Sequence, residues 1–130
     1  MKIQLRQVSA TASEATLGSH RIVIDRPVEK GGSDAGPMGG QLFLASVGGC
    51  FMSTLLAAIR AREAAISNVR LEVIGIHADP PTRFAALELH VNADTEDRES
   101  LQRLVAIADH GCVMMNTLRG TLDLKILINQ

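Results

Sequence analysis

The chain has 130 residues, about the size of one domain, and its formal net charge of −1 leaves no basic surface for nucleic acid or anionic lipid. Trp and Tyr are absent, which argues against base stacking, and two cysteines are too few for a secreted disulfide framework. The first residues alternate polar and apolar side chains without the apolar core of a signal peptide, so we expect one cytoplasmic domain over residues 1–130.

The first part of the chain has the pattern of a β-meander. Polar and apolar residues alternate over residues 2–9, 13–17 and 20–25, and a Gly-Ser turn joins the second and third of these segments. Residues 26–40 contain two prolines and five glycines, too many for a regular helix or strand. We therefore expect three strands followed by an irregular loop.

Residues 41–63 form the longest expected helix. No residue from Gln41 to Ile59 is charged, and this length is enough to cross a bilayer. The stretch also carries Gln, Ser, Thr and Gly, and a helix that is apolar all round is equally typical of one buried inside a protein. We favour the buried helix over a membrane span. Because so small a chain cannot cover it on every side, we expect a partner subunit to cover part of it.

The segment after this helix predicts a β-hairpin. Apolar and polar residues alternate over residues 69–76 and again over residues 85–91, with a Pro-Pro connection between the two strands. The alternation changes phase near Gly75, which predicts a β-bulge there.

The remaining residues predict a helix, a short helical turn and a last strand. The helix begins after Asp94 or Thr95 and ends at Gly111. A helical turn over 113–118 and a strand over 122–128 follow. The order is three strands, a helix, two strands, a helix and a strand, which is an α+β fold.

Cys50 and Cys112 are the only thiols in the chain. A free cysteine often serves as a small buried hydrophobe, so a structural role is the first interpretation of each. Cys50 lies in the middle of the long helix, after two glycines that permit close approach by another group. Cys112 follows Gly111 at the start of a helical turn, where free backbone N–H groups favour a thiolate. The sequence thus gives Cys112 a local reason for reactivity, whereas the reactivity of Cys50 depends on partner residues.

Other classes of site have little support in the sequence. The four histidines are scattered, and the pairs typical of zinc sites, such as CxxC or HxxxH, are missing, so we expect no metal. The glycine-rich run lacks the lysine of a phosphate-binding loop, and GxSxG does not occur. His110 either reinforces a thiolate at Cys112 or, as we favour, meets the negative end of the preceding helix.

Two segments carry a resemblance to a known family. The string DAGP at residues 34–37, followed by QLFLASVGGC at residues 41–50, resembles the first cysteine motif of the OsmC/Ohr family. These are osmotically inducible and organic-hydroperoxide-resistance proteins. The string ADHGC at residues 108–112, followed by TLRG at residues 117–120, resembles the second motif, and PPTRF at residues 80–84 lies between them. The resemblance covers nearly the whole chain.

The resemblance implies an intertwined homodimer with the element order βββ-α-ββ-α-β. Two central cysteine-bearing helices would be wrapped by antiparallel sheets from both subunits. It also implies a thiol peroxidase in which Cys50 attacks the peroxide, becomes a sulfenic acid and is resolved by Cys112 as a disulfide. A thiol reductant would restore the pair. No metal, organic cofactor, nucleic acid or membrane partner is expected.

The chain departs from the family pattern around Cys50. Family peroxidases hold the thiolate in a network with an arginine and with a glutamate ten residues before the first cysteine, where this chain has Gly40. The adjacent position, acidic in relatives, is Gln41, and Val113 stands where many relatives have proline. Without this network we expect the pKa of Cys50 to stay close to that of a free thiol, about 8.5.

The sequence offers two candidates for the catalytic arginine and three alternatives for the role of the two cysteines. Arg26 is the arginine that we expect to act with Cys50, and Arg21 is the alternative. The second function that we consider is a non-enzymatic OsmC-like protein that binds a small apolar ligand or senses redox state, with weak or no peroxidase activity. A purely structural pair of cysteines is the third.

Overall fold

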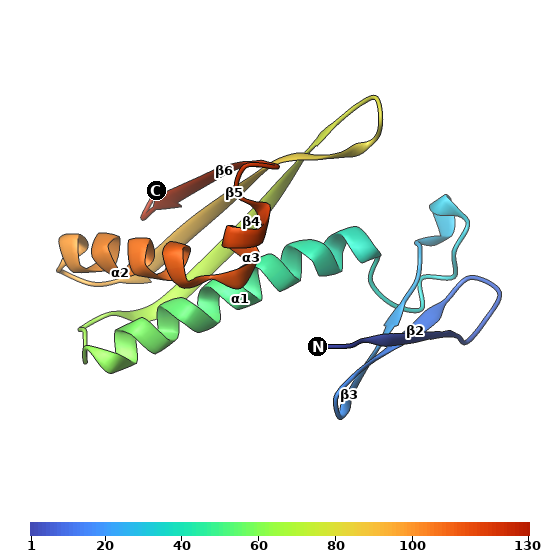
Figure 1. The fold of residues 1–130 in the computed structure, drawn as a ribbon, viewed down its shortest axis with the longest axis horizontal. Helices are drawn as coiled ribbons and strands as arrows, with labels where there is room; N and C mark the ends of the chain where they lie inside the picture. The colour runs from blue at the N-terminus through green and yellow to red at the C-terminus, as the bar shows by residue number, and fades with distance from the viewer. The chain divides into compact units, whose positions relative to one another are not determined.

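A computed structural model describes residues 1–130, which divide into two units, Met1–Phe43 and Leu44–Gln130. Figure 1 shows the elements of both. Each unit contains a three-stranded sheet of its own, and the boundary falls inside the long helix α1 (Gly39–Ala61). The expectation of one domain over residues 1–130 stays a prediction.

The first unit is an antiparallel meander of β1 (Gln4–Gln7), β2 (Ser13–Leu17) and β3 (His20–Ile24). The turn between β2 and β3 contains Gly18 with a φ of 62°, a left-handed conformation that costs glycine little. The three predicted strands are confirmed, although β1 is shorter than the expected span of residues 2–9.

The loop after β3 is organised by Asp25, a buried carboxylate that is 4% exposed. It accepts the backbone N–H groups of Arg26 at 2.7 Å, Ser33 at 3.1 Å and Ala35 at 3.1 Å. Burial acts to raise the pKa of Asp25, but these N–H donors outweigh it and lower the pKa. The loop expected to be irregular also contains one short 3₁₀ turn, Val28–Lys30.

The second unit combines a sheet with the helices. Its strands and remaining helices are β4 (Ser67–Ala78), β5 (Arg83–Asp94), α2 (Arg98–Gly111), α3 (Val113–Leu118) and β6 (Asp123–Ile128). The α+β order βββ-α-ββ-α-β is therefore confirmed, with α3 as the predicted short turn.

One strand pairing corrects the expectation of antiparallel sheets. β4 and β5 form the predicted antiparallel hairpin, but β6 runs parallel to β5 along the other edge of the sheet, in the order β4-β5-β6. The physical reason is the connection, because α2 and α3 carry the chain back along the sheet before β6 begins. A helical crossover of this kind is what a parallel pair requires.

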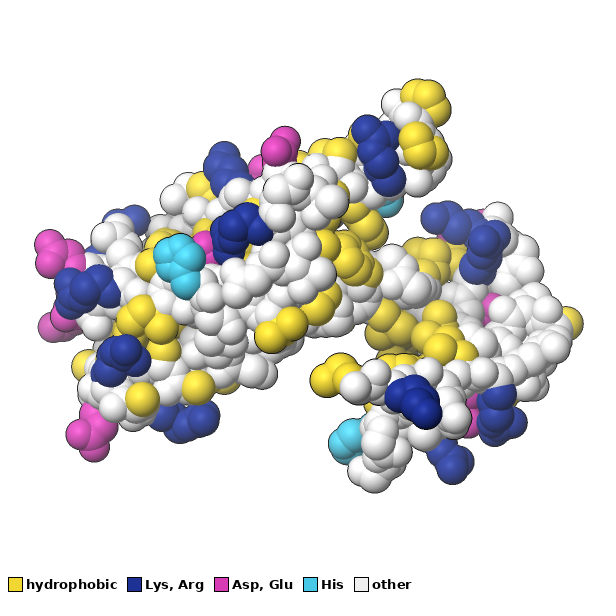
Figure 2. All heavy atoms as spheres, viewed as in Figure 1, with side chains coloured by type: hydrophobic (Ala, Val, Ile, Leu, Met, Phe, Trp, Pro, Cys, Tyr) yellow, Lys and Arg dark blue, Asp and Glu magenta, His cyan; other side chains and the backbone are white.

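The core of the second unit lies on one face of its sheet, where Figure 1 shows α1 and α2 running along the strands. Along β5 every second residue is buried: Leu87, Leu89, Val91 and Ala93. The helices contribute Val47, Phe51, Leu55, Ala58, Leu101, Leu104, Val105 and Ala108. Figure 2 shows Lys, Arg, Asp and Glu interspersed over the visible face of this unit.

The helix α1 is long and apolar enough to cross a membrane, judged by length and composition, and 33% of its most apolar stretch is buried within the chain. Its buried residues recur at helical spacing. The helix begins at Gly39 rather than at the expected residue 41, so two glycines form its first turn.

The β-bulge predicted at Gly75 lies one residue later in the structure. Gly75 is not the bulge, because it pairs with Leu87 and the register shifts one step later, between Ile76 and His77. The glycine is needed because the ring of Phe84 lies where a side chain would start, with its Cε1 atom 2.5 Å from the place of a Cβ.

α2 begins at Arg98, later than the expected start after Asp94 or Thr95. Its N-cap is Asp97, whose side chain accepts the N–H of Ser100 at 2.9 Å.

Candidate thiol site

Cys50 and Cys112 lie next to each other in the second unit, as the peroxidase hypothesis requires. The Sγ of Cys112 donates a hydrogen bond to the Sγ of Cys50 over 3.4 Å, and both residues are free thiols. A disulfide bond is about 2.05 Å long, so a small movement would close the pair. Cys50 comes from the middle of α1, and Cys112 from the corner between α2 and α3.

Cys112 is the residue at which one helix ends and the next begins. It is both the C-cap of α2 and the N-cap of α3, with extended backbone angles of φ −82° and ψ 118°. Its Sγ accepts the N–H of Met115 at 3.5 Å, and its own N–H donates to the carbonyl of Asp109 at 3.4 Å. The side chain is fully buried, at 0% exposure.

The start of α3 activates Cys50 rather than Cys112. The pKa of the Cys50 thiol is lowered, first by the backbone N–H of Met114; burial opposes this, and the Cys112 thiol and the N–H of Val113 add to it. These N–H groups belong to the first turn of α3, where no earlier carbonyl of the helix can accept them. The expectation that the pKa of Cys50 stays close to that of a free thiol is therefore corrected, because the start of a different helix supplies N–H donors.

The pKa of the second thiol, Cys112, is shifted in the opposite direction. Burial raises the pKa of Cys112; the N–H of Met115 opposes this, and the adjacent Cys50 raises the pKa further. The expectation that Cys112 is the locally activated cysteine is thus corrected, because its burial outweighs the N–H donor that it receives. The pKa of one thiol of the pair is thus lowered and the pKa of the other is raised.

Arg119, just after α3, is a charged residue of this corner that the sequence analysis did not single out. Its Nη2 atom lies 2.8 Å from Oδ1 of Asp109, and this bond raises the pKa of Arg119. Its charge also interacts with Cys112. The signal was present in the sequence, because Arg119 belongs to the TLRG string that follows the second cysteine motif.

An open apolar groove of about 440 Å³ lies in the second unit. It lies between α1 and β4 and is lined by Leu44, Ala45, Gly48, Gly49, Met52, Leu71 and Val73. This lining offers apolar contact to a ligand, and it includes Gly49, the residue before Cys50 in the chain.

The other residues expected near Cys50 belong to the first unit. Arg26 lines a cavity of about 580 Å³ there, and Arg21 is an exposed residue of β3. Gln41 accepts the N–H of Met38 at 2.9 Å through its carboxamide oxygen and so satisfies a donor at the start of α1, in whose first turn Gly40 lies. The pairing of Arg26 or Arg21 with Cys50 stays a prediction.

Two of the histidines contact neighbouring side chains, and a third lies at the end of a helix. His77 stacks on Phe84 with ring centroids 4.6 Å apart, and His90 lies 3.0 Å from the carboxylate of Glu88. His110 lies in the last turn of α2, at the end that attracts positive charge. No group of three or more His, Cys, Asp or Glu side chains is arranged to hold a metal ion.

The comparisons with known proteins agree with the observed fold. The family model of OsmC-like proteins matches residues 31–126. The chain is similar in structure to OhrB, the organic hydroperoxide resistance protein of Bacillus subtilis, at 25% identity and a TM-score of 0.71, over 98% of this chain and 96% of that one. The organic hydroperoxide resistance protein OsmC of Legionella pneumophila is 22% identical, with a TM-score of 0.77 over 99% and 96% of the two chains. An OsmC-like protein of Mycoplasma pneumoniae is 20% identical, with a TM-score of 0.82 over 98% and 93%. No curated protein sequence matches the chain.

Proposed function

This chain belongs to the OsmC-like protein family, and we propose that it is a thiol peroxidase that reduces organic hydroperoxides or hydrogen peroxide through Cys50 and Cys112. One observation carries the proposal: a thiol of lowered pKa lies 3.4 Å from a second thiol of raised pKa. Two of the similar structures are named as organic hydroperoxide resistance proteins, which supports the same chemistry.

Each thiol has one task in the reaction. The Cys50 thiolate attacks the terminal oxygen of the peroxide, the O–O bond breaks, and the alkoxide leaves as the alcohol after it takes a proton. Cys50 is then a sulfenic acid, oxidised by two electrons. The Cys112 sulfur attacks the Cys50 sulfur, the proton of the Cys112 thiol goes to the departing hydroxyl, and water leaves as the disulfide forms. A thiol reductant supplies two electrons by thiol–disulfide exchange and restores both thiols.

The proposed assembly is a cytoplasmic homodimer. The chain is a soluble OsmC-like protein and α1 is a core helix, yet only 33% of its most apolar stretch is buried within one chain. A second copy would cover the remainder, as the resemblance implies. Within this assembly we propose that Arg26 acts with Cys50 as the catalytic arginine.

The open groove favours a second candidate function, a non-enzymatic protein that binds a small apolar ligand or senses redox state. The groove offers about 440 Å³ of apolar space, and Gly49, the residue before Cys50 in the chain, lines it. Gly40 and Gln41 also leave the chain without the glutamate that family peroxidases place near the reactive thiolate. In this case oxidation of the two thiols would be slow.

The two functions differ in the rate at which the reduced protein consumes peroxide. We expect the wild-type protein to react rapidly with cumene hydroperoxide in a stopped-flow experiment and to form an intramolecular disulfide. Cys50→Ser should not react, whereas Cys112→Ser should react once and retain a sulfenic acid that dimedone traps. If the wild-type protein reacts no faster than free cysteine, the peroxidase proposal fails and the second candidate is preferred.

A further inference from the structure

The activation of Cys50 depends on where the helix α3 is held. The N–H groups that lower the pKa of Cys50 belong to Val113 and Met114, in the first turn of a helix of six residues. A helix of this length does not persist without tertiary contacts. The direction of these N–H groups therefore depends on the contacts that fix α3 against α2.

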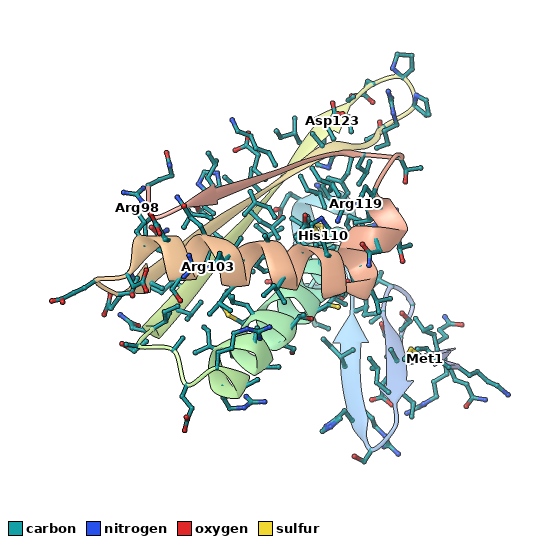
Figure 3. All side chains as sticks on the ribbon, turned by 60° about the vertical axis from the view of Figure 1, so that its left-hand side comes forward. Met1, Arg98, Arg103, His110, Arg119 and Asp123 are labelled. Atoms are coloured by element: carbon teal, nitrogen blue, oxygen red, sulfur yellow. The ribbon has the colours of Figure 1, made fainter.

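Arg119 makes the main polar contact of this kind. It is the C-cap of α3, where its N–H donates to the carbonyl of Met115 at 2.9 Å. Its guanidinium reaches back to the last turn of α2, with Nη2 2.8 Å from Oδ1 and 3.4 Å from the carbonyl oxygen of Asp109. Figure 3 shows Arg119 and His110 at the corner where the two helices meet, and Arg103 farther along α2.

Asn116 completes the connection from within α3. Its Nδ2 donates to the carbonyl of His110 at 2.9 Å, and its Oδ1 accepts from Nη2 of Arg119 at 3.5 Å. Both helices are thus joined across the corner through carbonyl groups that the end of α2 leaves without helical partners. The Asp109 side chain is only 18% exposed and that of Arg119 is 44% exposed, so solvent competes with the bond only in part.

We propose that Arg119 is a positioning residue for the reactive thiol: by tying the end of α3 to Asp109 of α2, it keeps the N–H groups of Val113 and Met114 directed at the Sγ of Cys50. The role rests on the proposed function, in which Cys50 reacts as a thiolate. Arg119 does not touch the peroxide in this scheme, and it acts through the position of a helix.

A direct effect of the positive charge on the thiolate is the alternative, and the two effects predict opposite results for Asp109→Asn. The charged and titratable groups at this corner are Cys112, Asp109, His110 and Arg119. If the charge of Arg119 acted directly, removal of the neighbouring carboxylate would leave that charge less neutralised and would lower the pKa of Cys50. If Arg119 acts through α3, the loss of its anchor should raise that pKa.

The experiment measures the rate of iodoacetamide alkylation against pH, in a Cys112→Ser background in which Cys50 is the only thiol. Serine is a good N-cap residue, so this background preserves the start of α3. We expect Arg119→Gln to move the midpoint upward and to slow alkylation at pH 7 by about threefold to tenfold, the change that about half to one pH unit gives. Arg119→Lys should restore part of the rate, because it keeps one charged donor for Asp109.

Arg103→Gln is the matched control. Arg103 is also an arginine of this unit, but it pairs with Glu99 at 3.7 Å on the exposed side of α2, with 65% of its side chain exposed. Its removal should leave the midpoint unchanged. Asp109→Asn should move the midpoint upward, and the Arg119→Gln/Asp109→Asn double variant should move it no further than Arg119→Gln alone, because both act through one contact.

Three results would overturn the proposal. They are an unchanged midpoint in folded Arg119→Gln, an equal shift in Arg103→Gln, and a downward shift in Asp109→Asn. A merely structural role would lower the melting temperature of Arg119→Gln without moving the midpoint. Because alkylation requires no peroxide, the result for Arg119 is independent of whether the wild-type protein proves to be a peroxidase.

Discussion

The substitution Met115→Ala tests whether the core anchors the short helix that activates Cys50. Met115 is the one buried residue of α3 and is 0% exposed. Truncation of a fully buried Met to Ala costs about 2–5 kcal/mol of unfolding free energy, from lost transfer free energy and from the cavity left behind. We expect a value in this range, because no other buried side chain of α3 can compensate.

Val113→Ala is the matched control on the same helix. Val113 lies two residues earlier and its exposed fraction is 70%, so its truncation removes little buried surface. Surface substitutions of this kind change stability by about 0.5 kcal/mol or less, and alanine is also the better helix former. The difference between the two variants therefore isolates the packing of Met115.

Urea unfolding followed by far-UV circular dichroism is the suitable assay, because the chain has neither Trp nor Tyr to report by fluorescence. With a urea m-value of about 2 kcal/mol/M, a loss of 2–5 kcal/mol moves the midpoint down by about 1–2.5 M. All variants must be compared at one protein concentration, since a homodimer links stability to concentration. If Met115→Ala unfolds within about 0.5 kcal/mol of Val113→Ala, α3 is not anchored by this side chain and the argument fails.

Two further predictions concern the thiols. Gly40→Glu restores the carboxylate of family peroxidases in the first turn of α1, where it is also favourable for the helix, and should accelerate peroxide oxidation of Cys50; Gly39→Glu, one position earlier and facing open space, should not. An equal or absent response of the two variants in stopped-flow oxidation would contradict the role assigned to position 40. Because burial raises the pKa of Cys112, its contribution to stability is complete below about pH 8.5 and is lost as pH rises through the raised pKa. In urea unfolding, Cys50→Ser should therefore lose stability as pH rises above about 8.5 relative to a variant without either cysteine, and parallel curves for the two would refute this.

The order of elements follows from local patterns, and for this reason it was predictable from the sequence. Alternation along residues 85–91 describes a strand with one buried face whatever its neighbours are, and the structure buries Leu87, Leu89 and Val91 on that face. The direction of β6 was not predictable in this way. Alternation is the same in parallel and antiparallel strands, so the pairing of β6 with β5 depends on the path of the crossover.

Gly75 shows a second limit of the sequence. A glycine at a change of phase favours a bulge, but it equally permits close approach by another group, and the two cannot be distinguished without the partner. Here the partner is Phe84, whose ring occupies the space of a side chain at position 75. The shift in register follows one residue later instead.

The assignment of reactivity between the two cysteines failed for a related reason. The sequence places the start of α3 next to Cys112, but adjacency along the chain does not say which sulfur the free N–H groups face. As N-cap, Cys112 receives the N–H of Met115, and burial still raises its pKa. The N–H groups of Val113 and Met114 act instead on Cys50, which lies 62 residues before Cys112 in the chain. Here the helix start therefore lowers the pKa of the cysteine that packs against it from another element, and the pKa of the capping cysteine is raised. It follows that substitutions in α3 and at Arg119 should change the reactivity of Cys50 more than they change the reactivity of Cys112.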